Sequence, residues 1–157
     1  MENASKALII AGAILISILL IGVGVMVMNG AQGGIDEAIQ SMSAQEKDMF
    51  NTKFTQYEGE KIKGANVRAV IRNIISSNSA NQDIDGKLVS LDVSKAYDGA
   101  PTAKLEAKSD DLKSNEMSVA SSKINTGATY TVTVEYNKAT GLVELVKVEK
   151  TTKKATE

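Results

Sequence analysis

The chain opens with an apolar run from Ala7 to Met28 that contains no charged residue and only one hydroxyl side chain, Ser17. A helix rises about 1.5 Å per residue, so a run of this length crosses a hydrocarbon core of roughly 30 Å with its backbone amides bonded inside the helix. The sequence therefore predicts a transmembrane helix over residues 7–28. A short tail, residues 1–6, precedes it, and the rest of the chain is tethered.

A cleaved secretory signal is the main alternative for this segment. The apolar part of such a signal spans about 7 to 15 residues and ends in small residues spaced for cleavage. This run is longer, and it ends with Met26, Met28 and Asn29 rather than with small residues. A retained anchor is therefore favoured, while a cleaved signal and the buried helix of a soluble protein stay as alternatives.

The charges beside the span predict its orientation. Lys6 and the α-amino group oppose Glu2 on one side, whereas Asp36 and Glu37 come first on the other. By the positive-inside rule the N-terminal tail is cytoplasmic and the C-terminal domain extracellular. We expect a single-pass protein of the cell membrane.

Composition narrows the chemistry of the tethered part. With 157 residues in all, the chain has room for one modest domain after its anchor. It has no Cys and no His, which excludes disulfides, thiolate or imidazole metal sites and His-based triads. Its 18 basic and 19 acidic residues give no basic face for nucleic acid. No small-molecule substrate is evident, and an enzyme is not expected.

Residues 29–57 read as a hinge followed by an amphipathic stalk helix. Gly30, Gly33 and Gly34 each disfavour helix by about 1 kcal/mol relative to Ala, which predicts a kink. Apolar residues then recur close to helical spacing. They are Ile35, Ile39, Met42, Met49, Phe50, Phe54 and Tyr57.

Residues 58–150 read as a small α+β domain, followed by a flexible tail at 151–157. A helix beginning near Asn66 has a tight apolar stripe made of Val67, Val70, Ile71, Ile74 and Ile75. Strands are predicted by alternation over 89–94, 103–107, 129–136 and 142–150, the last two as a hairpin with a bulge near Glu144. Residues 108–127 read as a surface loop with one helical turn. We expect one helix packed on an antiparallel sheet.

An apolar N-terminal helix, an amphipathic continuation and a C-terminal antiparallel sheet resemble the architecture of type IV pilins and pseudopilins. The resemblance lies in element order, because Met1–Lys6 has no Gly-Phe junction and the span has no acidic residue. It implies a subunit that assembles with copies or related subunits through its N-terminal helix.

The segments Met1–Ala13, Phe50–Gly59 and Gly64–Ile71 are also similar to small single-pass proteins of gut Gram-positive bacteria. This similarity implies a bacterial surface protein and no biochemistry. A sortase-anchored pilin is not expected, because the chain has no Leu-Pro-x-Thr-Gly signal.

A calcium loop is the most specific local pattern. Asn81, Asp83 and Asp85 hold loop positions 1, 3 and 5, Gly86 holds position 6 and Asp92 holds position 12. Ca²⁺ prefers such oxygen ligands. The competing interpretation is an Asp-Gly turn that leads into the strand carrying Asp92.

Two other groups of charged residues could each be a functional site or an ordinary solvated surface. Asp110, Asp111 and Glu116 form either an acid–base pair or, as we favour, a solvated acidic loop. Arg68 and Arg72 share a helix face and either hold an anion or are solvated.

The predicted function is that of a non-enzymatic, membrane-anchored, pilin-like or pseudopilin-like filament subunit. Small residues let membrane helices approach closely. The residues expected to pack between helices are Ala11, Ala13 and Ser17, continued outside the membrane by Ile35, Ile39 and Met42. The alternative is a monomeric, membrane-tethered binding module that recognises a wall polymer, a peptide or a membrane complex.

Overall fold

The computed structural model describes residues 2–151, with the side chains of residues 2, 22, 24–38 and 85 outside the description. The chain divides into two compact units, Met1–Ala38 and Ile39–Glu157, and the second is called the head below. From residue 152 on, the predicted flexible tail lies outside the described residues.

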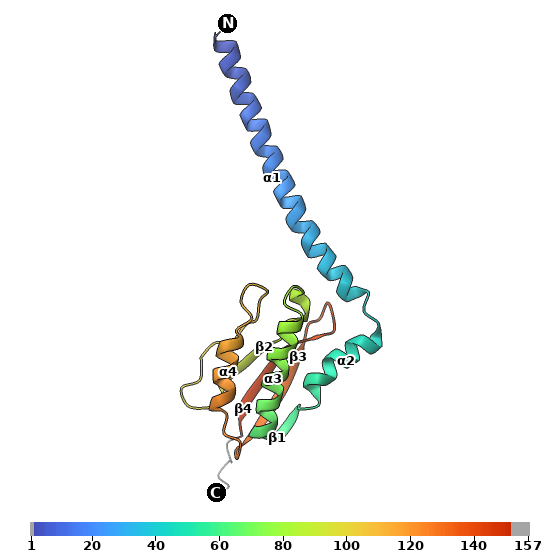
Figure 1. Ribbon diagram of the computed structural model, residues 1–157, viewed down its shortest axis with the longest axis vertical. Helices are drawn as coiled ribbons and strands as arrows, with labels where there is room; N and C mark the ends of the chain where they lie inside the picture. Colours follow the sequence, from blue (N-terminus) through green and yellow to red (C-terminus); the bar gives the residue numbers. More distant parts are fainter. Residues whose placement is uncertain (1, 152–157) are drawn as a thin grey trace. The chain divides into compact units, whose positions relative to one another are not determined.

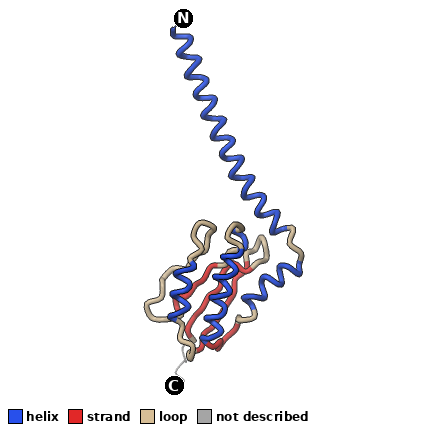
Figure 2. The backbone as a smooth tube through the Cα atoms, viewed as in Figure 1, coloured by secondary structure: helices blue, strands red, loops and turns tan. Residues whose placement is uncertain are grey.

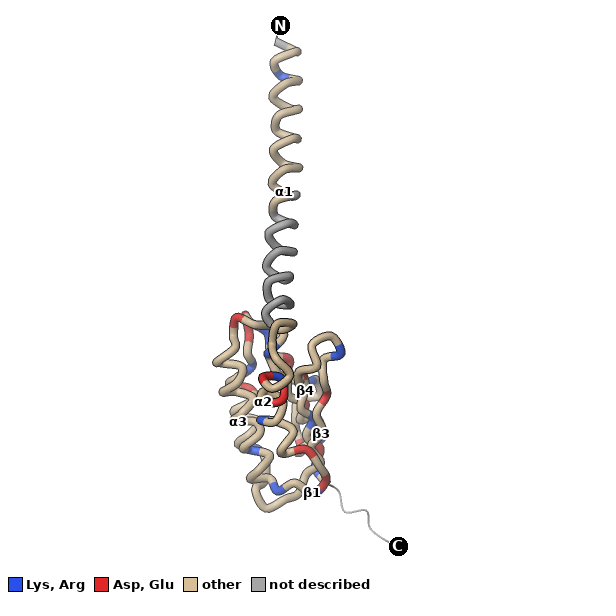
Figure 3. The backbone as a smooth tube through the Cα atoms, turned by 90° about the vertical axis from the view of Figure 1, so that its right-hand side faces the viewer, with Lys and Arg blue, Asp and Glu red and all other residues tan. Residues whose placement is uncertain are grey.

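Helix α1 (Glu2–Gln40) carries the apolar run (Figure 1). Within it, Asn3–Ile21 has a mean hydropathy of 2.4 and no part of it is buried against the rest of the described chain. Its one Lys or Arg is Lys6, near the start (Figure 3). This segment is long and apolar enough to cross a membrane.

The expected hinge at Asn29–Gly34 is replaced by continuous helix, and the break falls at Ser41–Ser43 instead. A capping box fixes the next helix, α2 (Ala44–Thr55). The Glu46 amide donates to Ser43 Oγ over 3.2 Å, and the Ser43 amide donates to the Glu46 carboxylate over 2.8 Å. A cap of this kind satisfies two amides that a helix start leaves unpaired, so it determines where α2 begins.

The head is built on a four-stranded mixed sheet, drawn in red in Figure 2. The strand order is β1-β3-β4-β2. Its strands are β1 (Gly59–Lys63), β2 (Ser90–Lys95), β3 (Thr129–Tyr136) and β4 (Val143–Lys150). Strands β1, β3 and β4 pair antiparallel, whereas β2 runs parallel to β4. The sequence predicted an antiparallel sheet. That prediction is wrong for β2, so the sheet is mixed.

Two helices cover one face of this sheet, α3 (Gly64–Ala80) and α4 (Ser114–Lys123) (Figure 1). The predicted stripe of α3 is buried, apart from a half-buried Ile75. Helix α3 packs against β1, β2 and β3 of the sheet. Phe50 and Phe54 of α2 pack edge to face at 5.4 Å. The largest fully buried side chains include Tyr130, Phe54, Ile39, Ile71, Ile74, Leu91 and Met117.

Two polar side chains join these elements. The Asn78 amide group donates to the Val89 carbonyl over 2.9 Å and accepts from the Val89 amide over 2.8 Å, which joins α3 to the start of β2. Arg68 donates to the carbonyls of Ser122 and Ile124, at the C-terminal end of α4. A cation there satisfies carbonyls that a helix end leaves unpaired. Arg68 is therefore structural and is not a free anion site.

Three elements differ from their predictions. Helix α4 replaces a surface loop, because Met117 and Ala120 face the core and Arg68 caps its end. Strand β1 occupies a stretch that reads as a break, with Lys61 at φ 60° and a register shift against β3. The predicted strand 103–107 reduces to a single bridge between Leu91 and Leu105.

Gly64, the first residue of α3, gives a test of how closely the head is packed. A Cβ at this position would lie 1.9 Å from the backbone oxygen of Asn125. We expect Gly64→Ala to lower the free energy of unfolding by about 1–3 kcal/mol through overpacking, although Ala is the better helix former. Thermal unfolding measures this.

Gly127→Ala is the matched control, because its Cβ would come no nearer than 3.5 Å to a neighbouring side chain. Equal stability of the Gly64→Ala variant and the wild type would contradict the close approach of α3 to the turn before β3.

Candidate functional site

A groove of about 680 Å³ lies at the edge of the sheet where β2 begins. It opens on the sheet face that α3 and α4 leave uncovered, since the Glu135, Leu145 and Ser90 side chains that line it alternate with the inward core residues. Its lining residues are Gly86, Leu88, Ser90, Lys104, Glu106, Ala107, Lys108, Ser109, Asp110, Glu135, Asn137, Glu144 and Leu145.

Strand register brings the floor of the groove together. Ser90 of β2 pairs with Leu145 of β4, and Leu145 pairs with Glu135 of β3. A bulge at Glu144 follows, because the next pair joins Tyr136 to Val143. Leu88 and Leu145 line the groove and are buried, so the floor is partly apolar beside Ser90 and Glu135.

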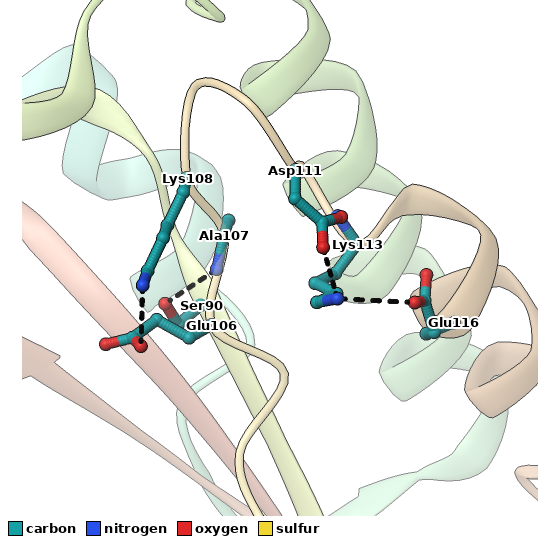
Figure 4. Close-up of polar contacts among 7 residues, drawn as sticks. All are labelled: Ser90, Glu106, Ala107, Lys108, Asp111, Lys113 and Glu116. Atoms are coloured by element: carbon teal, nitrogen blue, oxygen red, sulfur yellow. Dashed lines mark hydrogen bonds and ion pairs between the residues drawn. The ribbon is translucent and has the colours of Figure 1, made fainter.

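One wall is the segment 104–110, which lies beside β2. Leu91 and Leu105 exchange two backbone hydrogen bonds, of 3.0 and 2.7 Å. The Ala107 amide then donates to Ser90 Oγ over 3.2 Å (Figure 4). This wall covers the outer edge of β2. The backbone groups at that edge are therefore not open to pairing with another strand.

A tight turn connects this wall to α4. Lys108 and Asp111 exchange backbone hydrogen bonds of 2.9 and 3.0 Å, and Lys113 follows in the left-handed region at φ 54°. Such a conformation is strained for a residue other than glycine. The Asp111 carboxylate stabilises this conformation of Lys113 by accepting a hydrogen bond from the Lys113 amide. The Lys113 ammonium group pairs with Asp111 and Glu116 (Figure 4).

These bonds shift the ionisation of both partners. Hydrogen bonds from the Lys113 side chain and amide lower the pKa of the Asp111 carboxyl, and the Asp111 carboxylate raises the pKa of Lys113. An acid–base pair needs carboxyls with pKa values pushed apart. Here Asp111 is held as a carboxylate, which fits the solvated acidic loop.

Most charges around the groove are already paired. Glu106 lies 3.5 Å from the Lys104 ammonium and 3.8 Å from that of Lys108. Glu135 pairs with Lys147 on the neighbouring strand. Within residues 2–151, Asp110 and Glu144 line the groove without an ammonium or guanidinium group at ion-pair distance.

Where the structure describes them, the residues of the calcium pattern are exposed or have other hydrogen-bond partners. Asn81 donates its side-chain amide to the Ser77 carbonyl, Asp83 is exposed, and the side chain of Asp85 lies outside the description. Asp92 sits in β2, where its carboxylate accepts from the Ser94 amide over 2.9 Å. Asp92 therefore lies in the strand that the competing interpretation predicted. No group of three His, Cys, Asp or Glu residues able to hold a metal occurs among the described residues.

The predicted helix-packing residues have different positions. Ala11, Ala13 and Ser17 are exposed on α1, and Ser17 donates its hydroxyl to the Ala13 carbonyl over 2.8 Å. Ile39, expected to pack between subunits, is fully buried within the head. Met42 is half-buried, and the side chain of Ile35 lies outside the description.

Comparison with known proteins finds no matching family model, no matching curated protein and no matching solved structure. Function is therefore inferred from the residues of this chain.

The sequence did not predict the groove. Its floor and walls come from the start of β2, the 104–110 segment and the β3–β4 hairpin, which meet only after β2 has paired parallel to β4. The one local signal was the bulge expected near Glu144, which the register confirms.

Ser90 tests how the 104–110 wall is held. We expect Ser90→Ala to lower stability by about 1 kcal/mol, because the Ala107 amide loses its acceptor. Hydrogen exchange at the Ala107 amide should accelerate while exchange in the β3–β4 ladder stays unchanged. Unchanged exchange at Ala107 would contradict this contact.

Asp92 gives a pH test. Burial raises the pKa of its carboxyl, but the Ser94 amide and hydroxyl and the Lys147 and Lys95 ammonium groups outweigh this and hold the pKa below 3.8. A carboxyl with a depressed pKa stabilises the fold above its unfolded value, and this contribution is lost as the pH falls through the folded value.

We therefore expect Asp92→Asn to be less stable than the wild type at pH 7, and the difference to shrink below pH 3.8. Asp98→Asn, at an exposed carboxyl, is the control. Unfolding midpoints measured from pH 7 to pH 2 test this, and a difference that does not depend on pH would contradict it.

Proposed function

We propose that this chain is a non-enzymatic, membrane-anchored surface protein that assembles through its N-terminal helix as a pilin-like subunit. The observation that carries the proposal is the apolar surface of Asn3–Ile21, none of which is buried. Burying one Leu or Ile side chain stabilises a protein by about 1.5–3 kcal/mol relative to leaving it in water. In the proposed state, lipid and neighbouring helices bury these side chains.

Lateral assembly is supported by the small residues on one part of α1. Ala13 and Ser17 are one turn apart, and the Ser17 hydroxyl already has its acceptor within the helix. The hydroxyl therefore needs neither water nor a partner in the membrane, and the small side chains leave room for a second helix.

The absence of His and Cys from the sequence and the state of the carboxyls support a non-enzymatic role. The pKa values of Glu46, Asp92 and Asp111 are all lowered, largely by hydrogen bonds that overcome the opposing effect of burial at Asp92. A general acid or base works best with a pKa near the working pH, so these shifts run in the wrong direction for catalysis.

Crosslinking of the full chain in membranes tests the assembly. Ala13→Phe with Ser17→Phe should abolish a ladder of crosslinked oligomers, because two large rings block close approach of the helices. Leu15→Phe with Leu19→Phe is the matched control, placed roughly 200° around the helix. An unchanged ladder in the first variant, or no ladder in the wild type, would contradict the proposal.

The groove favours a second function, a monomeric tethered module that binds a wall polymer, a peptide or a membrane complex. A partly apolar concavity with convergent polar groups is the usual form of a binding site. Size-exclusion chromatography in detergent discriminates between the two functions, since the module predicts a monomer and the subunit predicts an oligomer.

A further inference from the structure

We propose that the groove binds the lysine-bearing C-terminal segment of a second copy of this chain, around Lys153 and Lys154. This inference rests on the proposed assembly, which brings copies together in one membrane. It concerns a contact between heads that is separate from the contact between N-terminal helices.

Within residues 2–151, two carboxylates of the groove have no ammonium or guanidinium group at ion-pair distance. Asp110 comes from the turn between Lys108 and Asp111, and Glu144 comes from the bulge of β4. The lysines that line the groove both face Glu106, and Glu135 is paired with Lys147. A cationic ligand therefore meets carboxylates that no residue of the described head neutralises.

The floor suits an aliphatic stem that ends in a charge. Leu88 and Leu145 are buried beneath the opening, and Ala107 lies beside them. Lysine side chains pack their methylene groups on apolar surface and keep the ammonium group at the polar rim. The groove offers both surfaces within one concavity.

The C-terminal segment has the complementary chemistry. After Lys150 the sequence continues as Thr-Thr-Lys-Lys-Ala-Thr-Glu, in which Lys153 and Lys154 are the cations and the other side chains before Glu157 are small. Small side chains around the two lysines place few steric demands on a binding groove.

A chain cannot place these lysines in its own groove. The Thr151 amide donates to the Thr129 carbonyl just after β4 ends at Lys150, whereas Glu144 lies near the start of β4. At about 3.3 Å per residue Glu144 is roughly 23 Å back along the strand, whereas the Lys154 backbone reaches at most about 10 Å from Thr151 and its side chain adds about 6 Å. The groove is therefore filled by another copy, in a head-to-tail contact.

Contacts between exposed charges are individually weak, so a free tail binds its groove only loosely. Assembly through α1 raises the effective concentration of one tail at a neighbouring groove, which makes a weak contact occupied.

Binding of a fluorescent peptide, residues 148–157, to the full chain in detergent tests the groove without requiring assembly. We expect a Kd between about 0.1 and 1 mM in 50 mM salt, weakened about tenfold by Asp110→Lys with Glu144→Lys. Glu60→Lys with Asp98→Lys makes the same change of charge at exposed carboxyls outside the groove and should leave the Kd within about twofold. A peptide with Lys153→Glu and Lys154→Glu should not bind.

Disulfide trapping then tests the contact between whole chains, since the sequence has no cysteine of its own. Copies with Glu144→Cys and differently tagged copies with Lys154→Cys should form a mixed disulfide when expressed together. Glu60→Cys with Lys154→Cys is the control pair and should not.

The inference is overturned if the peptide fails to bind at 2 mM, if both charge-reversal variants bind it equally, or if the control pair crosslinks as well as the Glu144 pair. These results leave the crosslinked ladder of the N-terminal helix unchanged. Loss of that ladder in the wild type, with peptide binding intact, contradicts the proposed assembly instead.

Discussion

The apolar side chains along Asn3–Ile21 find no burial within the described chain, and every functional argument about this protein depends on that constraint. Moving apolar surface from water into hydrocarbon is favourable by a free energy proportional to its area. A helix can make this transfer because its backbone hydrogen bonds are all internal. In the proposed membrane-anchored state the head is tethered. Such attachment would concentrate weak contacts between heads.

The head is held by a core of its own and by a few well-placed polar bonds. Helix α3 packs with its buried stripe against β1, β2 and β3, and Asn78 joins α3 to the start of β2 through two hydrogen bonds. Arg68 holds the end of α4. With one sheet face covered in this way, the other keeps charged and hydroxyl side chains, and the groove forms where β2 meets the 104–110 wall. The same strand pairing therefore builds the core and the candidate binding surface.

Strict periodicity made part of this fold predictable from sequence. Alternation over 129–136 and 142–150 predicted the β3–β4 hairpin, and a tight apolar stripe predicted α3. Helix α4 was missed because it buries little besides Met117 and Ala120 and is capped by Arg68, which lies far away in sequence. The parallel pairing of β2 with β4 has no local signal, and the groove depends on it. Local patterns identified the elements, while long-range pairing decided the site.

The account is tested most directly by asking where the intact chain resides. Cell membranes carrying the full chain are washed with alkaline carbonate, and intact cells are treated with a protease. Membrane anchoring predicts that the chain stays in the carbonate-washed pellet and that external protease removes the head while the N-terminal helix is protected. Recovery of the intact chain in the soluble fraction without detergent, or a head resistant to protease until the cells are broken, would contradict it.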